Sequence, residues 1–279
     1  MCNKNTEEEI RSIFRLLNEW YYFPNYQLER RVDIFFAHFL LEILSIDEPK
    51  DSVHIIPEFP LWAELKPDGK ATRHSKKVDY AVISKHTTTV YFVELKTTDK
   101  SIKDSVKKDE KLQVERMAEL YRKDWYDLLA DALFICNRYD EYKELREFLC
   151  GSMNIDVYKI KPLYKEPDIN KWRSEIKKLS LLDTSKKWNI KPIYIIPMKC
   201  TKEDSKNETP NYETYLKNYD IDEDIDFTVI TFNDVINVLN TKNNPLANEF
   251  SIFLSNILKK TKVYPSNTQT VEAQCNNDL

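Results

Sequence analysis

The chain of 279 residues contains only two glycines, Gly69 and Gly151. At the average usage of about 7%, about twenty would be expected. Phosphate-binding P-loops, the dinucleotide-binding fingerprint and the glycine-rich kinase loop each need several backbone positions that a side chain would block. Two isolated glycines cannot build any of these loops, so the sequence excludes nucleotide-driven enzymes that depend on them.

The cysteines and histidines follow no metal-binding or disulfide pattern. The five cysteines include no CxxC pair, and the four histidines form no HExxH motif. This cysteine usage favours a reducing cytoplasm, and any bound metal would need oxygen ligands. The first residues lack a basic and then apolar signal sequence, and charged residues interrupt the most apolar run, residues 32–44. We therefore expect a cytoplasmic protein without a membrane span.

The net charge of −4 argues against a protein coated in nucleic acid, but the charge is unevenly distributed. Residues 66–123 carry fifteen Lys and Arg side chains against nine Asp and Glu side chains, whereas acidic residues gather in residues 203–226. On charge alone, a solvated lysine-rich surface is the simpler interpretation of the basic stretch. The stretch becomes a candidate nucleic-acid surface only through the residues that it surrounds.

Capping residues and hydrophobic periodicity divide the chain into helices and strands. Thr6 and Glu9 have the spacing of a capping box, and Pro24 ends the helix that follows. Helices are predicted over residues 6–24, 26–46, 105–129, 141–149, 169–182, 233–239 and 248–260. Strands are predicted over residues 53–62, 77–83, 89–96, 132–136, 156–163, 190–197 and 227–232, with a surface excursion over residues 200–226.

This order of elements predicts an α/β protein with a mixed central β-sheet flanked by helices. We expect an N-terminal helix in residues 1–25, a core in residues 26–150, and a C-terminal α/β extension of the same domain in residues 151–260. Residues 261–279 are rich in Ser, Thr, Gln and Asn, and we expect them to form a disordered tail.

Three charged residues are predicted to converge on one face of the sheet. Glu94 and Lys96 share a strand face because side chains alternate along a strand. If residues 77–83 and 89–96 form an antiparallel hairpin, a two-residue loop at residues 86–87 sets Asp79 opposite Glu94. A four-residue loop at residues 86–89 would set Asp79 opposite Lys96 instead. Either register brings the two carboxylates and the ammonium group together.

Two converging carboxylates are hard oxygen ligands that suit Mg²⁺ or Mn²⁺. The neighbouring ammonium group of Lys96 could orient an attacking water and offset the charge of a phosphate. A metal ion at such a site acts as a Lewis acid on a phosphoryl oxygen and lowers the pKa of bound water. The predicted reaction is therefore the hydrolysis of a phosphodiester.

With these residues the sequence resembles the PD-(D/E)XK nuclease superfamily, which has the restriction-endonuclease-like fold. The resemblance covers roughly residues 26–137 and implies that Asp79 and Glu94 bind a metal while Lys96 assists the nucleophile. Some members add an acidic residue from the first helix, for which Glu42 is the best-placed match. The recombination-exonuclease branch adds a glutamine on the helix after the ExK strand, and Gln113 occupies a comparable place. The QxxxY continuation of that branch is absent, because Met117 follows Gln113 by four residues.

The ExK triplet alone is weak evidence, because acid-x-Lys triplets are common in this composition. Other such triplets begin, for example, at Glu48, Glu64, Asp109, Glu141 and Glu175. Glu94 differs in its context, since it ends a β-rich segment, follows an acid-bearing strand at hairpin distance and precedes a predicted helix. A structural ion pair is the competing interpretation of the three residues. However, strands disfavour Asp, and facing carboxylates repel each other without a cation.

The sequence therefore predicts a metal-dependent nuclease that acts on nucleic acid, with DNA favoured over RNA. Restriction, repair and defence against mobile elements are all compatible roles. The alternative is a catalytically silent module with the nuclease fold that binds nucleic acid or a protein partner, and a homodimer is also compatible with the sequence.

Overall fold

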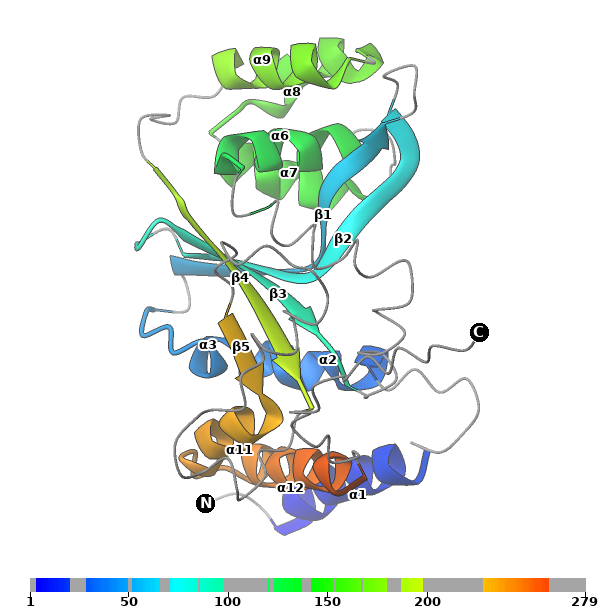
Figure 1. The fold of residues 1–279 in the computed structure, drawn as a ribbon, viewed down its shortest axis with the longest axis vertical. Coiled ribbons are helices and arrows are strands. Elements are labelled where there is room, and N and C mark those ends of the chain that lie inside the picture. The colour runs from blue at the N-terminus through cyan, green and yellow to red at the C-terminus, as the bar shows by residue number, and fades with distance from the viewer. Residues whose placement is uncertain are drawn as a thin grey trace, which may run out of the picture.

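The computed structural model describes residues 4–20, 29–49, 52–65, 71–84, 86–97, 120, 123–136, 142–152, 154–166, 168–179, 187–197 and 228–260. These residues form an α/β structure in which helices flank a five-stranded mixed sheet (Figure 1). The strands are β1 (Val53–Leu65), β2 (Ala71–Ser84), β3 (Thr89–Leu95), β4 (Asn189–Ile196) and β5 (Thr228–Thr231). The α-helices are α1 (Lys4–Trp20), α2 (Glu29–His38), α3 (Leu40–Ile43), α6 (Trp125–Cys136), α7 (Lys143–Ser152), α8 (Val157–Ile160), α9 (Ile169–Leu179), α11 (Phe232–Asn240) and α12 (Pro245–Lys260), and η3 (Lys161–Lys165) is a 3-10 helix.

The strands lie in their sequence order, β1-β2-β3-β4-β5. The first three form an antiparallel meander, whereas β4 runs parallel to β3 and β5 runs parallel to β4. Strands β4 and β5 come from the region that we expected to be an extension, and they continue the sheet of the core. The central strand β3 is almost entirely buried, which fits a strand that is covered on both faces.

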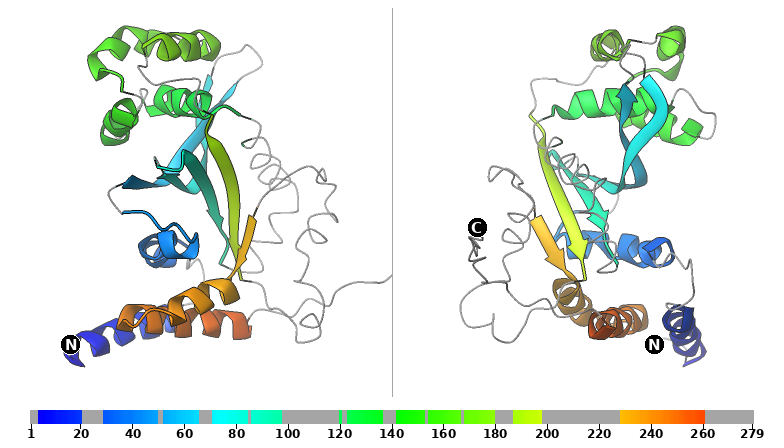
Figure 2. Two further views of the ribbon diagram at one scale, coloured as in Figure 1. Left: turned by 90° about the vertical axis from the view of Figure 1, so that its left-hand side faces the viewer. Right: turned by 45° about the vertical axis from the view of Figure 1, so that its right-hand side comes forward.

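One face of the sheet packs against α6, with α7 and α9 behind it (Figure 2). Phe92 of β3 meets Phe59 of β1 and Trp125 of α6, with ring centroids 5.8 and 6.2 Å apart. Asp131 of α6 is fully buried and forms a two-pronged ion pair with Arg173 of α9, at 2.6 and 2.7 Å. The pair gives the buried carboxylate two charge-assisted hydrogen bonds and ties α9 to α6.

The other face packs against α2, α3, α11 and α12, and α1 lies beside α12 (Figure 1). Val93 and Leu95 of β3 point to this side, while Val90 and Phe92 point toward α6. A group of aromatic rings from four helices and from Phe39, between α2 and α3, fills this layer; it consists of Phe14, Phe35, Phe36, Phe39, Phe232, Phe250 and Phe253. The alternation along β3 therefore assigns each of its side chains to one of two cores.

The β1–β2 hairpin bends toward α6 near the middle of both strands (Figure 1). The bend coincides with Glu58, whose φ of 51° is in the left-handed region that non-glycine residues seldom adopt. Pro57 pairs with Tyr80 and Phe59 with Val78, so Glu58 and Asp79 lie between these two pairs. Asp79 therefore lies at the point where the hairpin changes direction.

Most predicted elements are confirmed within the described residues, including the first helix and the three strands of the meander. The single helix predicted over residues 26–46 is divided at Phe39, which has φ −102° and ψ 10°, into α2 and α3. Of the helix predicted over residues 105–129, residues 105–119 lie outside the described residues. The predicted excursion and the predicted tail, residues 261–279, lie outside them as well.

Two predicted strands are wrong. Residues 132–136 belong to helix α6, which is buried on all sides and so lacks the polar face that would reveal a helical period. Residues 156–163 form α8 and the start of η3 instead of a strand. The Asp156 side chain caps α8 by accepting a hydrogen bond from the Tyr158 N–H group at 2.9 Å, and Pro162 lies in the first turn of η3.

None of the helices in the described ranges is both long and apolar enough to cross a membrane.

Candidate active site

The register of the β2–β3 hairpin brings Asp79 next to Glu94. Ser84 pairs with Thr89 and Tyr80 pairs with Val93, so the next position of the register sets Asp79 opposite Glu94. This register is the one expected for the two-residue loop at residues 86–87. It excludes the register of the loop at residues 86–89, which would have set Asp79 opposite Lys96. The site therefore begins where the hydrogen-bonded ladder of the hairpin ends.

The carboxylate of Asp79 is held by the backbone of the neighbouring strand. Its Oδ2 accepts a hydrogen bond from the N–H group of Leu95 at 2.6 Å. A bond to an ionised acceptor is stronger than one between neutral groups. The side chain of Asp79 is thus fixed beside residues 94 and 95, although Asp79 itself is only half-buried.

Glu94 and Lys96 form an ion pair on the same face of β3. The Nζ atom of Lys96 lies 2.7 Å from Oε1 of Glu94. The two side chains are only 12% and 6% exposed, so the pair is shielded from water. The backbone N–H group of Lys96 donates to the carbonyl of Ile195 on β4 at 2.8 Å, which fixes the chain just after β3 ends. Both charged groups therefore project from an anchored backbone.

The other two predicted site residues are not placed with these three. Glu42 lies on α3, in the helix layer that covers the opposite face of the sheet. Its Oε1 lies 3.7 Å from Nζ of Lys242, just after α11, and its Oε2 is buried without a hydrogen bond from the described residues. Gln113 lies outside the described residues. The structure therefore brings together Asp79, Glu94 and Lys96.

The donor set of the site fits a hard divalent cation. Among the described residues, no group of three or more His, Cys, Asp and Glu side chains is arranged to hold a metal ion. Mg²⁺, however, often binds through one or two carboxylates and keeps several of its waters. Asp79 and Glu94 supply two carboxylates at one end of the hairpin, and these are the residues that would hold such an ion.

One other acid-x-Lys triplet lies wholly within the described residues, and its surroundings are different. Glu175 and Lys177 lie on helix α9, where residues two apart point in different directions. Accordingly, Lys177 pairs with Asp127 at 2.9 Å and Glu175 pairs with Lys178 at 2.7 Å. Of these two triplets, it is Glu94-Leu95-Lys96 in which the acid and the lysine form an ion pair with each other.

Sequence reasoning missed the buried ion pair between Asp131 and Arg173. Burial raises the pKa of Asp131, while the hydrogen bond and the positive charge of Arg173 oppose this rise. The sequence does contain a sign of this buried charge, because Asp131 is the only charged residue in the otherwise apolar run 128–136. The pair links α6 to α9 within the core, so we interpret it as structural rather than as part of the candidate site.

Comparisons of the chain with models of protein families, with curated proteins and with solved structures find no match.

Proposed function

We propose that this chain is a metal-dependent nuclease with a restriction-endonuclease-like core, and that DNA is its favoured substrate. The observation that carries the proposal is the convergence of Asp79, Glu94 and Lys96 at the end of the β2–β3 hairpin. Two carboxylates and one ammonium group in a sheltered position are costly for a purely structural site, because facing carboxylates repel each other.

The order of the elements supports the proposed fold. A helical segment (α2 and α3) precedes the antiparallel meander β1–β3, and α6 and the parallel strand β4 follow it. The resemblance implies the order helix, three strands, helix and strand within residues 26–137, and the structure has this order as far as α6. Strand β4 takes the place of the strand that we had predicted at residues 132–136, and α7, α8, η3 and α9 lie between α6 and β4.

The proposed roles follow from the position of each side chain. Asp79 and Glu94 hold the divalent ion, Mg²⁺ or Mn²⁺, which when bound supplies Lewis-acid stabilisation of the charge on the phosphoryl group. The hydrogen bond from Leu95 N–H holds Asp79 in place before any ion binds. Lys96 holds its positive charge beside the same carboxylates, where it can donate a hydrogen bond to the phosphodiester or to the attacking water.

The test is a cleavage assay on supercoiled plasmid, linear duplex DNA, single-stranded DNA and RNA, each with Mg²⁺, Mn²⁺ or a chelator. We expect cleavage of DNA that needs a divalent ion and no ATP. Asp79→Asn, Glu94→Gln and Lys96→Ala should each reduce the rate by about 100-fold or more, the usual range for loss of a group that stabilises developing charge. Cleavage that persists after exhaustive chelation would contradict the proposal.

A matched control comes from the triplet on α9, which has the same residue types and spacing. Glu175→Gln and Lys177→Ala change the same charges at the surface of the molecule, so both should leave cleavage unchanged. Circular dichroism of every variant separates loss of folding from loss of chemistry. Equal losses in the two sets of variants would show that the effect is not specific to Glu94 and Lys96.

One observation favours the alternative function, a catalytically silent module that binds nucleic acid or a protein partner. Lys96 already neutralises Glu94 at 2.7 Å, as a structural ion pair would. Titration of Mn²⁺ into the protein, followed by calorimetry, distinguishes the two functions. The nuclease requires binding that Asp79→Asn and Glu94→Gln both weaken, whereas a silent module has no need of the ion.

A further inference from the structure

Glu58 has a backbone conformation that is unusual inside a strand. Among the residues that the structure describes, four non-glycine residues have a positive φ. Ser45, Thr88 and Asn154 lie in turns, where left-handed residues usually occur, whereas Glu58, with a φ of 51°, lies within strand β1. The left-handed conformation costs free energy in any residue other than glycine, so the surrounding structure must hold Glu58 in it.

The local sequence also favours an irregular strand at this position. Prolines flank Glu58 in the segment Pro57-Glu58-Phe59-Pro60, on the edge strand of the sheet. Proline lacks a backbone N–H group and is therefore confined to edge strands and to irregular points of a sheet. The irregular point of β1 is thus already marked in the sequence.

The side chains of both strands of the β1–β2 hairpin change faces at the level of Glu58. Ile56 and Phe59 of β1 are three residues apart, yet both lie in the core on the α6 side of the sheet. The same is true of Val78 and Ala81 of β2. Residues three apart in a regular strand face opposite sides, so the alternation is broken on both strands where the hairpin bends.

Strand β2 separates from β3 at the same level. The last register pair of these two strands is Tyr80 with Val93, whereas β2 and β1 continue to pair beyond Glu58. Two paired strands can leave a third strand in this way only if they bend together. The bend at Glu58 therefore separates β2 from β3 at Asp79.

The separation lets the side chain of Asp79 take the place of the β2 backbone. The N–H group of Lys96 donates to the carbonyl of Ile195 on β4, so the N–H group of Leu95, one residue earlier, faces β2. This N–H group donates to Oδ2 of Asp79 at 2.6 Å. If the hairpin were straight, the ladder would continue and a backbone carbonyl of β2 would compete for the same N–H group.

The charge of Glu58 is a poor explanation of the bend. Its carboxylate lies 3.4 Å from Nζ of Lys77, and the two side chains are 63% and 36% exposed. Exposed ion pairs contribute little to stability. The backbone conformation of residue 58 is therefore the feature that matters.

We propose that Glu58 is a positioning residue for Asp79, because its left-handed backbone holds the bend that lets Asp79 bond to Leu95 beside Glu94. The proposal rests on the proposed function in one respect, namely that Asp79 is a ligand of the divalent ion. The conformation at residue 58, and not its carboxylate, then controls both the hydrogen bond of Asp79 and the affinity for the ion.

Hydrogen exchange of two neighbouring amides, measured by NMR on the full chain in chelator, tests this placement. The amide of Leu95 reports on Asp79, and the amide of Lys96, which is bonded to β4, is the internal reference. Glu58→Val introduces a β-branched side chain, which strongly disfavours a positive φ. We expect the exchange of Leu95 relative to Lys96 to become about tenfold faster, and an unchanged ratio would overturn the proposal. Asp79→Ala gives the ratio that results when the acceptor is lost.

Matched variants separate the backbone from the side chain and from strain in general. Glu58→Asn and Glu58→Gly remove the carboxylate but accept a positive φ, so both should keep the original ratio. Ser45→Val places valine at a φ of 54° in the turn after α3, and it should keep the ratio even if it destabilises the protein. A rise in Glu58→Asn, or in Ser45→Val, as large as the rise in Glu58→Val would overturn the proposal.

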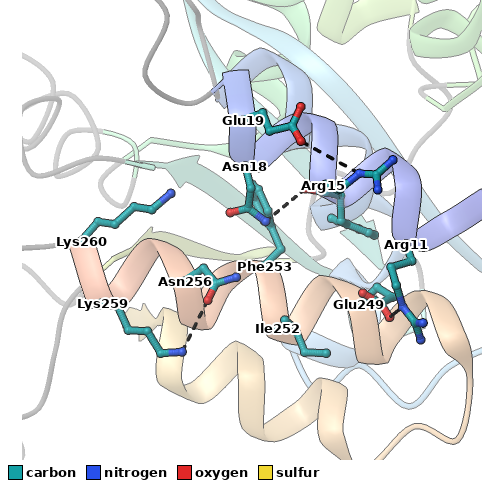
Figure 3. Close-up of a pocket in the computed structure, with 11 residues that line it drawn as sticks. Arg11, Arg15, Asn18, Glu19, Glu249, Ile252, Phe253, Asn256, Lys259 and Lys260 are labelled. Carbon is teal, nitrogen blue, oxygen red and sulfur yellow. Dashed lines mark hydrogen bonds and ion pairs between the residues drawn. The ribbon is translucent and has the colours of Figure 1, made fainter. Parts of the chain in front are cut away.

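A second pair of variants tests the ion pair directly. Lys77→Ala breaks the pair with Glu58, and Arg11→Ala breaks the pair of Arg11 with Glu249 at 2.9 Å, in the groove between α1 and α12 (Figure 3). Both variants should keep the original exchange ratio. A rise in Lys77→Ala alone would overturn the proposal, because the charge of Glu58 would then position Asp79.

A milder substitution covers the case in which Glu58→Val does not fold, as judged by circular dichroism. Thr88 has a φ of 49°, so this protein tolerates a β-branched residue at a positive φ. Glu58→Thr then replaces Glu58→Val, with Ser45→Thr as its control and with the same expected results.

Calorimetric titration of Mn²⁺ distinguishes a failure of this proposal from a failure of the nuclease function. If the original protein binds Mn²⁺, Glu58→Val should weaken binding by about tenfold or more, and Glu58→Asn should not. Equal affinity in Glu58→Val and the original protein would overturn the role of the bend. If the original protein binds no Mn²⁺, the metal site is refuted, and the exchange ratio still decides whether Glu58 positions Asp79.

Discussion

Replacing Lys96 by alanine should destabilise the metal-free protein and leave a site that a divalent ion can restore. In the metal-free protein, the ammonium group of Lys96 is the counter-charge of Glu94, whose side chain is only 6% exposed. Removing one partner of a fully buried ion pair costs about 3–5 kcal/mol. Lys96 is 12% exposed, so some solvent reaches the pair, and we expect a loss of about 2–3 kcal/mol in the free energy of unfolding.

A bound divalent ion should offset this loss because it takes over the role of the counter-charge. An ion at 100 times its dissociation constant stabilises the folded state by about 2.7 kcal/mol. In the original protein the ion must share Glu94 with Lys96, whereas Lys96→Ala removes this competitor. Mn²⁺ at a fixed concentration should therefore stabilise the variant more than the original protein.

Urea denaturation in chelator and in Mn²⁺, followed by circular dichroism, measures both quantities. Lys177→Ala is the control, because Lys177 and its partner Asp127 are 40% and 32% exposed. It should cost no more than about 1 kcal/mol and should not respond to Mn²⁺. If Lys96→Ala loses the expected stability and Mn²⁺ restores none of it, the pair is purely structural and the metal-site hypothesis is refuted.

Three other predictions concern the core, the thiols and the basic stretch. Arg173→Ala should cost about 3 kcal/mol at neutral pH. The charge of Lys123 then remains to oppose the effect of burial, but the opposition of Arg173 is lost, so the pKa of Asp131 should rise further, and urea midpoints should show a smaller deficit near pH 5 than near pH 8. Burial raises the pKa of Cys136 to about 12 and that of Cys150 to about 11. Both thiols should therefore resist alkylation at pH 8 until urea unfolds the protein. Alkylation of either thiol in the native protein, measured by mass spectrometry, would contradict this prediction. DNA binding, if residues 66–123 provide the surface, should weaken steeply with salt as counterions are released, and an affinity that stays flat between 50 and about 200 mM salt would exclude that surface.

Local patterns in the sequence were sufficient where a local rule decides the structure. Alternation and turn spacing predicted the meander, and they placed Asp79, Glu94 and Lys96 together before any fold was known. This worked because a hairpin joins residues that are close in sequence, so its register depends on a short loop. Helical periodicity likewise predicted α1 and α12, each of which has a polar and an apolar face.

Tertiary structure decided the features that depend on distant partners. Residues 132–136 are helical because α6 is enclosed by the sheet and α9, and an enclosed helix has no polar face to reveal its period. Glu42 was predicted from its helix alone, but the packing of α3 against α11 places it beside Lys242. The groove between α1 and α12 joins segments from the two ends of the chain, which no local pattern relates. Side-chain periodicity tells which face of an element is buried, whereas only the packed fold determines what that face meets.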